Sequence, residues 1–134
     1  MQDRAKVICH MMTTIDGKIV IDFDGNEDYE KAGDEYDRLV MEYGLAWGCG
    51  RATFQEDIPV DFSKYQGVRV TYQDKVIQPP EGEHLCVAFD RYGKLRWESN
   101  RTNYAGVDNL LLEVITEQVK PEFLAYLDQL GVPY

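Results

Sequence analysis

The sequence predicts an α/β domain with a mostly parallel central sheet flanked by helices. Short apolar runs with strand character alternate along the chain with stretches of helical periodicity, an order typical of βαβ units. The run His84–Phe89 predicts one of the strands, and Pro121 predicts the start of a helix that Gly131 ends, because proline suits a first helical turn and glycine a helix end. The 134 residues contain no internal repeat, so we expect a single domain over residues 1–134.

The first half of the chain predicts a strand, a polar loop, a helix, a second strand and a short helix. The run Lys6–Met12 is apolar on both faces, which favours a buried strand near the middle of the sheet. Asp34 is placed to cap the following helix and Gly44 to end it. The other expected segments are the polar loop at 22–28, a strand at 45–47 and a helix from Arg51 to a point before Pro59.

The second half predicts strands separated by turns and then a final helix. Pro79–Gly82 and Arg91–Lys94 have turn composition. The last strand contains one charged position, Glu113. The expected strands are 68–72, 84–89, 95–97 and 110–115.

Charge and cysteine content exclude several classes of protein. The net charge of -10 argues against a general binder of nucleic acid or of anionic membranes, since both need a basic face. The net charge does not exclude a local anion pocket, because such a pocket needs only a few donors. The 3 cysteines show no CxxC spacing, which favours a reduced cytoplasmic setting without structural disulfides. We expect no signal peptide and no membrane span.

A possible anion-binding segment is Gly50-Arg51-Ala52-Thr53, which follows a short apolar run. Glycine lets the backbone approach a ligand closely, and a helix that begins here would direct free N–H groups at an anion. Arg51 adds a forked donor suited to phosphate oxygens, and Thr53 adds a hydroxyl. Four residues recur by chance, so a plain helix start with an exposed arginine is the alternative.

The second segment is Thr14-Ile15-Asp16-Gly17-Lys18, directly after the first apolar run. A strand that ends in an acid, a glycine and a lysine places chemistry at the carboxyl end of a strand, where α/β proteins usually bind ligands. Asp-Gly is also a favoured turn pair, so an ordinary turn is the alternative.

Taken in order, these segments resemble the dihydrofolate-reductase-like superfamily, and most closely its riboflavin-biosynthesis reductase branch. The order is a strand, Thr-x-Asp-Gly-Lys, a helix, a short strand and Gly-Arg-x-Thr, and further likeness lies in 87–97, 111–117 and 123–134. The resemblance touches most of the chain. It implies a dihydrofolate-reductase-like fold and an NADPH-dependent hydride transfer to a ribosylaminopyrimidine or a related small heterocycle.

The resemblance also implies roles for particular residues. Gly50, Arg51 and Thr53 would contact the phosphate portion of NADPH, and Thr116 would lie near its adenosine ribose. Asp16 and Lys18 would be the catalytic candidates, organising proton delivery or holding a substrate group, and Thr14 would join Asp16 and Lys18 in contacting substrate. Glu117 opposes this arrangement, since a carboxylate repels a neighbouring phosphate.

The resemblance further implies that the domain is truncated. Family members continue past the equivalent of Tyr134 with strands and a glycine-pair turn that clasps the pyrophosphate. We therefore expect an incomplete domain whose exposed strand edges favour a homo-oligomer. A second hypothesis is a non-catalytic remnant that serves as a binding or assembly module.

Three other features have ordinary explanations. Asp24, Asn26 and Asp28 have the spacing of an EF-hand loop, but Tyr29 occupies the position that requires glycine, which favours a solvated acidic loop and no metal site. His10 and His84 have no partner at zinc-ligand spacing, so both are expected to be structural. Cys49, beside Arg51, could carry a lowered pKa, although an ordinary half-buried thiol is the alternative.

Overall fold

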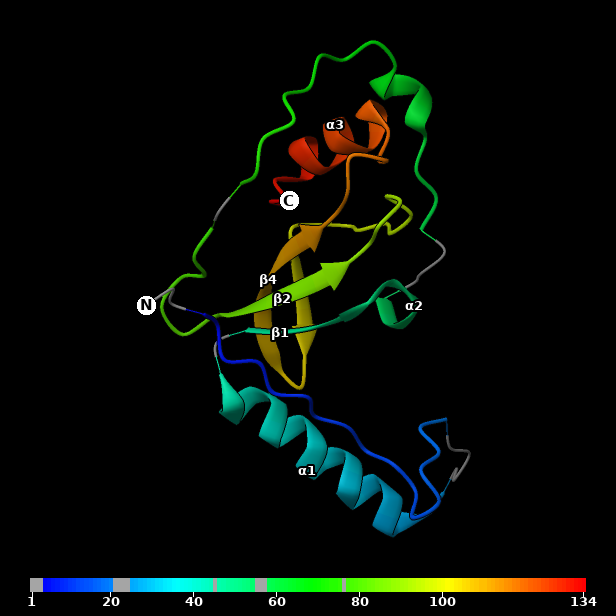
Figure 1. Cartoon of the computed structure of the whole chain (residues 1–134), viewed down its shortest axis with the longest axis vertical. Coiled ribbons are helices and arrows are strands. Elements are labelled where there is room, and N and C mark those ends of the chain that lie inside the picture. The colour runs from blue at the N-terminus through cyan, green and yellow to red at the C-terminus, as the bar shows by residue number, and fades with distance from the viewer. Residues whose placement is uncertain (1–3, 21–24, 45, 55–57, 76) are drawn as a thin grey trace. The chain divides into compact units, whose positions relative to one another are not determined.

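The computed structural model describes residues 4–20, 25–44, 46–54, 58–75 and 77–134 (Figure 1). The chain groups into two compact units, Met1–Gly44 and Leu45–Tyr134. The sequence predicts a single domain with no boundary at Gly44, only the end of a helix. Leu45, part of the predicted loop at 22–28 and the predicted helix beyond Phe54 lie outside the described residues.

The first unit contains one long helix, α1 (Glu27–Tyr43). The prediction that Asp34 caps this helix is wrong, because α1 begins earlier and Asn26 is its cap. The Asn26 side-chain oxygen accepts hydrogen bonds from the backbone N–H groups of Asp28 (3.0 Å) and Tyr29 (3.1 Å), which satisfies two of the unpaired donors at the helix start. The predicted end of the helix at Gly44 is confirmed.

The predicted strand at Lys6–Met12 is wrong. The residues have no regular secondary structure, and the side chain of Val7 is 87% exposed. Strand pairing needs a neighbouring strand, and the described part of this unit contains none. The segment instead contacts α1, since the His10 ring stacks on Tyr36 at 4.3 Å between centroids, and the Tyr36 hydroxyl donates to the His10 carbonyl oxygen at 3.4 Å.

The second unit is built on a four-stranded sheet in the order β1-β2-β4-β3. The strands β1, β2 and β4 are parallel, and β3 is antiparallel to β4, so the expectation of an α/β fold with a mostly parallel sheet is confirmed at that level. The strand bounds are β1 (Ala46–Gly50), β2 (His84–Phe89), β3 (Arg101–Tyr104) and β4 (Val107–Val114). The sequence pattern does not predict β3.

The helix α3 (Pro121–Leu130) supplies more of the core of this unit than any other element. It contains a run of five consecutive buried residues from Phe123 to Leu127, and these pack with Cys86 of β2 and Leu111 of β4. Its predicted bounds are confirmed, and Gly131 ends it in the left-handed conformation (φ 70°). Two short helices complete the unit, α2 (Arg51–Phe54) and the 3₁₀ helix η1 (Phe62–Tyr65).

Two further predicted strands, Val68–Tyr72 and Leu95–Trp97, are wrong. The backbone of Trp97 is paired by a side chain instead of a strand, because its N–H donates to the Tyr126 hydroxyl at 2.5 Å and its carbonyl accepts from that hydroxyl at 2.7 Å. The predicted turn at Pro79–Gly82 is confirmed by the bond from the Glu83 N–H to the Pro80 carbonyl oxygen (3.0 Å). No helix within the described ranges has the length and apolar character to cross a membrane.

Candidate functional site

The carboxyl ends of three parallel strands lie at one edge of the sheet in the second unit. The pairing register places Gly50 of β1 opposite Phe89 of β2, and Phe89 opposite Val114 of β4. The three segments that follow these strands therefore leave the sheet at the same level. Ligands of open α/β sheets bind preferentially at such an edge.

Three of the predicted cofactor-binding residues lie where β1 ends. Gly50 is its last residue, and a Cβ added there would have open space around it. Arg51 begins α2, which also contains Thr53. The Thr53 side chain shares a hydrogen bond with the Cys49 thiol. Burial raises the pKa of that thiol, and the bond from Thr53 offsets the rise only in part, so the hypothesis of a lowered pKa at Cys49 is wrong.

The fourth predicted residue, Thr116, lies two positions beyond the end of β4, at the same edge. Its hydroxyl donates to the Arg91 carbonyl oxygen at 2.8 Å and accepts from the Gln118 N–H at 3.3 Å. Thr116 thus connects the segment after β4 to the segment after β2. Its single hydroxyl proton is used within the protein, so toward a ligand it could act only as an acceptor.

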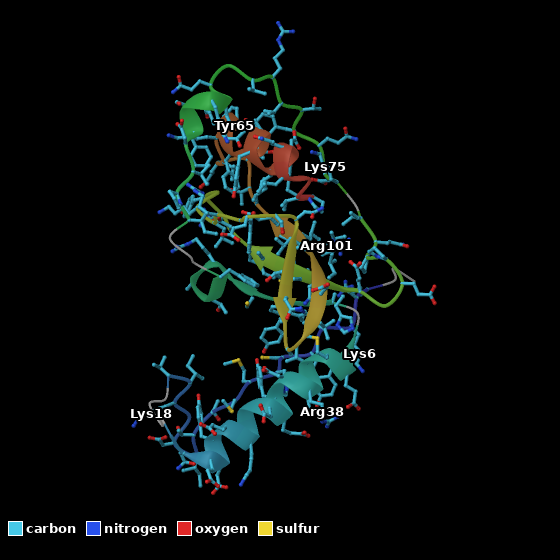
Figure 2. All side chains as sticks on the ribbon, turned by 180° about the vertical axis from the view of Figure 1, so that it is seen from behind. Lys6, Lys18, Arg38, Tyr65, Lys75 and Arg101 are labelled. Atoms are coloured by element: carbon cyan, nitrogen blue, oxygen red, sulfur yellow. The ribbon has the colours of Figure 1, made fainter. Side chains whose placement is uncertain are left out.

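The predicted substrate residues Thr14, Asp16 and Lys18 lie together in the first unit (Figure 2 labels Lys18). They form a tight turn in which the Gly17 N–H donates to the Thr14 carbonyl oxygen at 2.9 Å and Gly17 takes a positive φ of 83°. The Thr14 hydroxyl donates to the Asp16 carboxylate, and the Lys18 ammonium lies 3.1 Å from it. The bond from Thr14, followed by that from Lys18, lowers the pKa of Asp16. Asp16 is therefore a carboxylate at neutral pH, in a turn exposed to solvent.

A buried aspartate organises the loop after β2. Asp90 is fully buried, and its carboxylate accepts from the backbone N–H groups of Leu95 (2.6 Å), Tyr92 (3.3 Å) and Lys94. Gly93, at the centre of the loop, has a positive φ of 65°, and a Cβ there would lie 2.8 Å from the Phe123 ring. The Asp90 carboxylate therefore fixes the path of the loop, and the missing side chain of Gly93 lets the loop pack closely against α3.

A second buried acid, Glu113, lies on β4. Its Oε2 accepts from the Trp97 indole N–H at 2.7 Å, while its Oε1 has no hydrogen-bond partner among the described residues. Burial, followed by smaller effects that include the nearby Asp90, raises the pKa of Glu113 to about 8. At neutral pH its carboxyl group is therefore mostly protonated.

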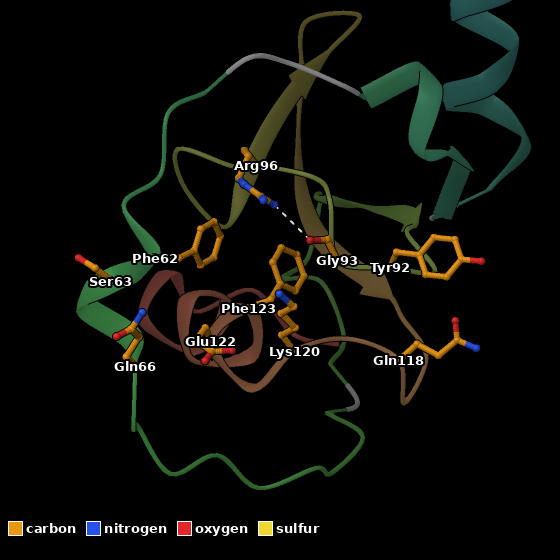
Figure 3. A pocket seen from close by; sticks show the side chains of 10 residues that line it. All are labelled: Phe62, Ser63, Gln66, Tyr92, Gly93, Arg96, Gln118, Lys120, Glu122 and Phe123. Atoms are coloured by element: carbon orange, nitrogen blue, oxygen red, sulfur yellow. Dashed lines mark hydrogen bonds between the residues drawn. The ribbon is translucent and has the colours of Figure 1, made fainter.

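A pocket of about 450 Å³ lies beside the loop that follows β2 (Figure 3). Three segments line it: η1 with the residue after it, the loop after β2, and the start of α3 with the turn before it. The lining residues are Phe62, Ser63, Gln66, Tyr92, Gly93, Arg96, Gln118, Lys120, Glu122 and Phe123. Its size is in the usual range for small-molecule sites.

The sequence pattern does not indicate Arg96, Lys120 or the role of Asp90 in this region. Its signal concerns the buried acids alone, since Glu113 is a charged residue inside an apolar strand. No group of three or more histidine, cysteine or acidic side chains within the described ranges is placed to hold a metal ion, and Asp24 lies outside those ranges.

Comparison with protein-family models, with curated proteins and with solved structures found no match to this chain.

Proposed function

We propose that the chain binds NADPH and is a reductase of the riboflavin-biosynthesis type that acts on a ribosylaminopyrimidine or a related small heterocycle. The observation that carries the proposal is the register of β1, β2 and β4, which brings the segments containing Gly50 and Thr116 to one sheet edge. These segments are far apart in the sequence, and the family resemblance assigns both of them to the cofactor.

The residues at this edge fit a phosphate-bearing cofactor in part. Gly50 leaves open space for close approach, and the Arg51 guanidinium can pair with phosphate oxygens. Thr116 already donates its hydroxyl proton to a protein carbonyl and could only add an acceptor, while the Thr53 hydroxyl is shared with the Cys49 thiol. Exposed Glu117 would repel a phosphate. NADPH would supply the hydride, and the protein would orient it.

The two charged residues of the turn at 14–18, Asp16 and Lys18, would act on the substrate, each in the role that its charge allows. The lowered pKa of Asp16 makes it an acceptor at neutral pH. Lys18, paired with it at 3.1 Å, would be the donor that holds a substrate hydroxyl or phosphate, or delivers a proton. Replacing Asp16 and Lys18 singly by alanine should reduce turnover, and unchanged turnover in both variants would contradict these roles.

The experiment that tests cofactor binding is a titration with NADPH and NADH. The emission of Trp47 and Trp97 would report binding, and calorimetry would check it. We expect saturable binding of NADPH that weakens at least about tenfold in Arg51→Ala, since a charged hydrogen bond to phosphate is lost. Arg101→Ala is the matched control. It removes an arginine of β3 that forms an ion pair with Glu83. Absence of binding at millimolar NADPH would contradict the proposal.

A non-catalytic assembly module is the second candidate, and exposed apolar side chains on the sheet favour it. Phe89 is 53% exposed and Val114 is 41% exposed, and they are paired in register on neighbouring strands. We propose that the chain forms a homo-oligomer, whichever of the two functions it has, since such side chains favour association. Sedimentation as a monomer at micromolar concentration would contradict self-association.

A further inference from the structure

The pocket beside the loop after β2 contains two cationic side chains, Arg96 and Lys120, and one acid, Glu122. The chain as a whole has 24 acidic and 14 basic residues, so an average surface pocket would contain more acidic than basic side chains. The cationic excess here is therefore a local feature. It does not follow from composition.

The Arg96 guanidinium is held in place by two aromatic rings and two carbonyl groups. Its central carbon lies 4.5 Å from the Phe62 ring centroid and 5.5 Å from that of Phe123. One terminal nitrogen, Nη1, donates to the carbonyl oxygens of Leu95 (2.6 Å) and Gly93 (3.3 Å), and Figure 3 shows the second of these bonds. The group is thus positioned before any ligand arrives, which reduces the entropic cost of binding.

The same guanidinium retains donors for a ligand. Its Nε and Nη2 make no hydrogen bond with the part of the chain that the structure describes, and Arg96 forms no ion pair there. Arginine pairs with carboxylates and phosphates through two parallel N–H groups. A partly buried arginine with two unused donors is therefore suited to bind one anionic group.

Lys120 provides the second charge. It is exposed, stands directly before α3 and makes no ion pair with another described residue. The positive end of the α3 dipole adds to its field. The rest of the lining includes polar side chains from Ser63, Gln66 and Gln118 and the ring of Tyr92.

We propose that this pocket binds a small organic anion, a carboxylate or phosphate group carried on a flat ring. Arg96 and Lys120 hold the anionic group, and the aromatic lining contacts the ring. A volume of about 450 Å³ accommodates a ring with its anionic group and exceeds what a free inorganic ion needs. The site does not depend on the proposed reductase activity.

The test is calorimetric titration of the full chain with four probes: phenyl phosphate, benzoate, inorganic phosphate and benzyl alcohol. We expect saturable binding of phenyl phosphate or benzoate, the tighter of the two identifying the preferred anionic group. Inorganic phosphate, which lacks the ring, and benzyl alcohol, which lacks the charge, should bind at least about tenfold more weakly. Equal binding of benzyl alcohol, or no binding of either anion at about 10 mM, would overturn the proposal.

Variants locate the binding. Lys120→Gln changes an exposed side chain and should weaken phenyl phosphate about tenfold without altering the circular dichroism spectrum. Arg96→Gln should weaken it at least as much. Lys31→Gln, an exposed lysine of α1 outside the lining, is the control and should leave affinity unchanged. Wild-type affinity in Lys120→Gln and Arg96→Gln would overturn the assignment.

A competition arm separates this site from the proposed cofactor site. Phenyl phosphate should stay bound when NADPH is added, and Arg51→Ala should bind it with wild-type affinity. Displacement by NADPH would overturn the proposal of a separate site. Loss of NADPH binding alone would count against the reductase and would leave this inference intact.

Discussion

The two compact units differ in what their helices pack against. No described residue of the first unit is fully buried, and α1 has no buried side chain. In the second unit α3 has five, in a core that joins it to the sheet. Both helices have a capping device, Asn26 for α1 and Gly131 for α3. The difference shows that helical periodicity and capping residues are enough to specify a helix. The free energy that stabilises the helix comes instead from the apolar side chains that it packs against.

Truncating one apolar residue in each helix tests this difference most directly. Leu127→Ala removes a fully buried side chain of α3 and should lower the free energy of unfolding by about 2–5 kcal/mol. Val40→Ala, at a half-buried position of α1, should cost under about 1 kcal/mol, since little packing is lost. Urea denaturation followed by circular dichroism measures both, and equal losses would contradict the comparison.

The acids of the two units should respond oppositely to pH. Glu113 has a pKa raised to about 8 from 4.5, so the folded state retains a proton that the unfolded chain has lost between those values. Its contribution is fully present below pH 4.5 and is lost as pH rises from there through about 8, by up to about 1.4 kcal/mol per pH unit and about 5 kcal/mol in all.

Glu113→Gln should remove this decline in a series of denaturation curves, since glutamine keeps the Trp97 bond without titrating. Asp16 has a lowered pKa, so its contribution has the opposite sign and is lost at acid pH, but its full exposure makes it small. An unchanged pH profile in Glu113→Gln would show that the carboxyl is not the group responsible.

A pair of glycines provides a third comparison. Gly93→Ala places a Cβ 2.8 Å from the Phe123 ring at a positive φ of 65°, so strain and overpacking should together cost about 2 kcal/mol or more. Gly17→Ala has a similar φ of 83° with nothing within 4 Å, so only the backbone cost of about 1 kcal/mol applies. Thermal unfolding distinguishes them, and equal shifts in Tm would mean that the Phe123 contact carries no cost.

The smallest expected effect concerns the cap of α1. Asn26→Ala removes the acceptor for two N–H groups and should lower helix stability by about 1 kcal/mol. Circular dichroism at 222 nm should show fraying of α1, while Trp47 and Trp97 emission, which report the second unit, should not change. A change in that emission would contradict the division into units.

The sequence predicted the elements that depend on local chemistry. Bounds such as Pro121, Gly131 and Gly44 were readable because a helix end is determined by adjacent residues. The strand expected at Lys6–Met12 failed because pairing depends on distant partners, which an apolar run does not reveal. The polar strand β3 was missed because it has no apolar run to mark it. It is the outermost strand of the sheet and pairs with β4 through a hairpin turn at Ala105 and Gly106.

The residues of the candidate sites also differ in how far the sequence predicts them, for the same reason. The turn of Thr14, Asp16 and Lys18 was predictable because its members are neighbours in the chain. Arg96 and Lys120 were not, because the pocket gathers residues from three segments and no spacing in the sequence connects them.

The Tyr126 hydroxyl takes the place of a strand partner for Trp97, and Asp90 fixes the loop before it from within. The conformation of this loop therefore depends on Asp90 and Tyr126 and not on the exposed side chains of the loop. The exposed side chain of Tyr92, which lines the pocket, can be exchanged without changing the path of the backbone. Substitution there can alter ligand preference while the fold is conserved, so this position is where related sequences would be free to diversify.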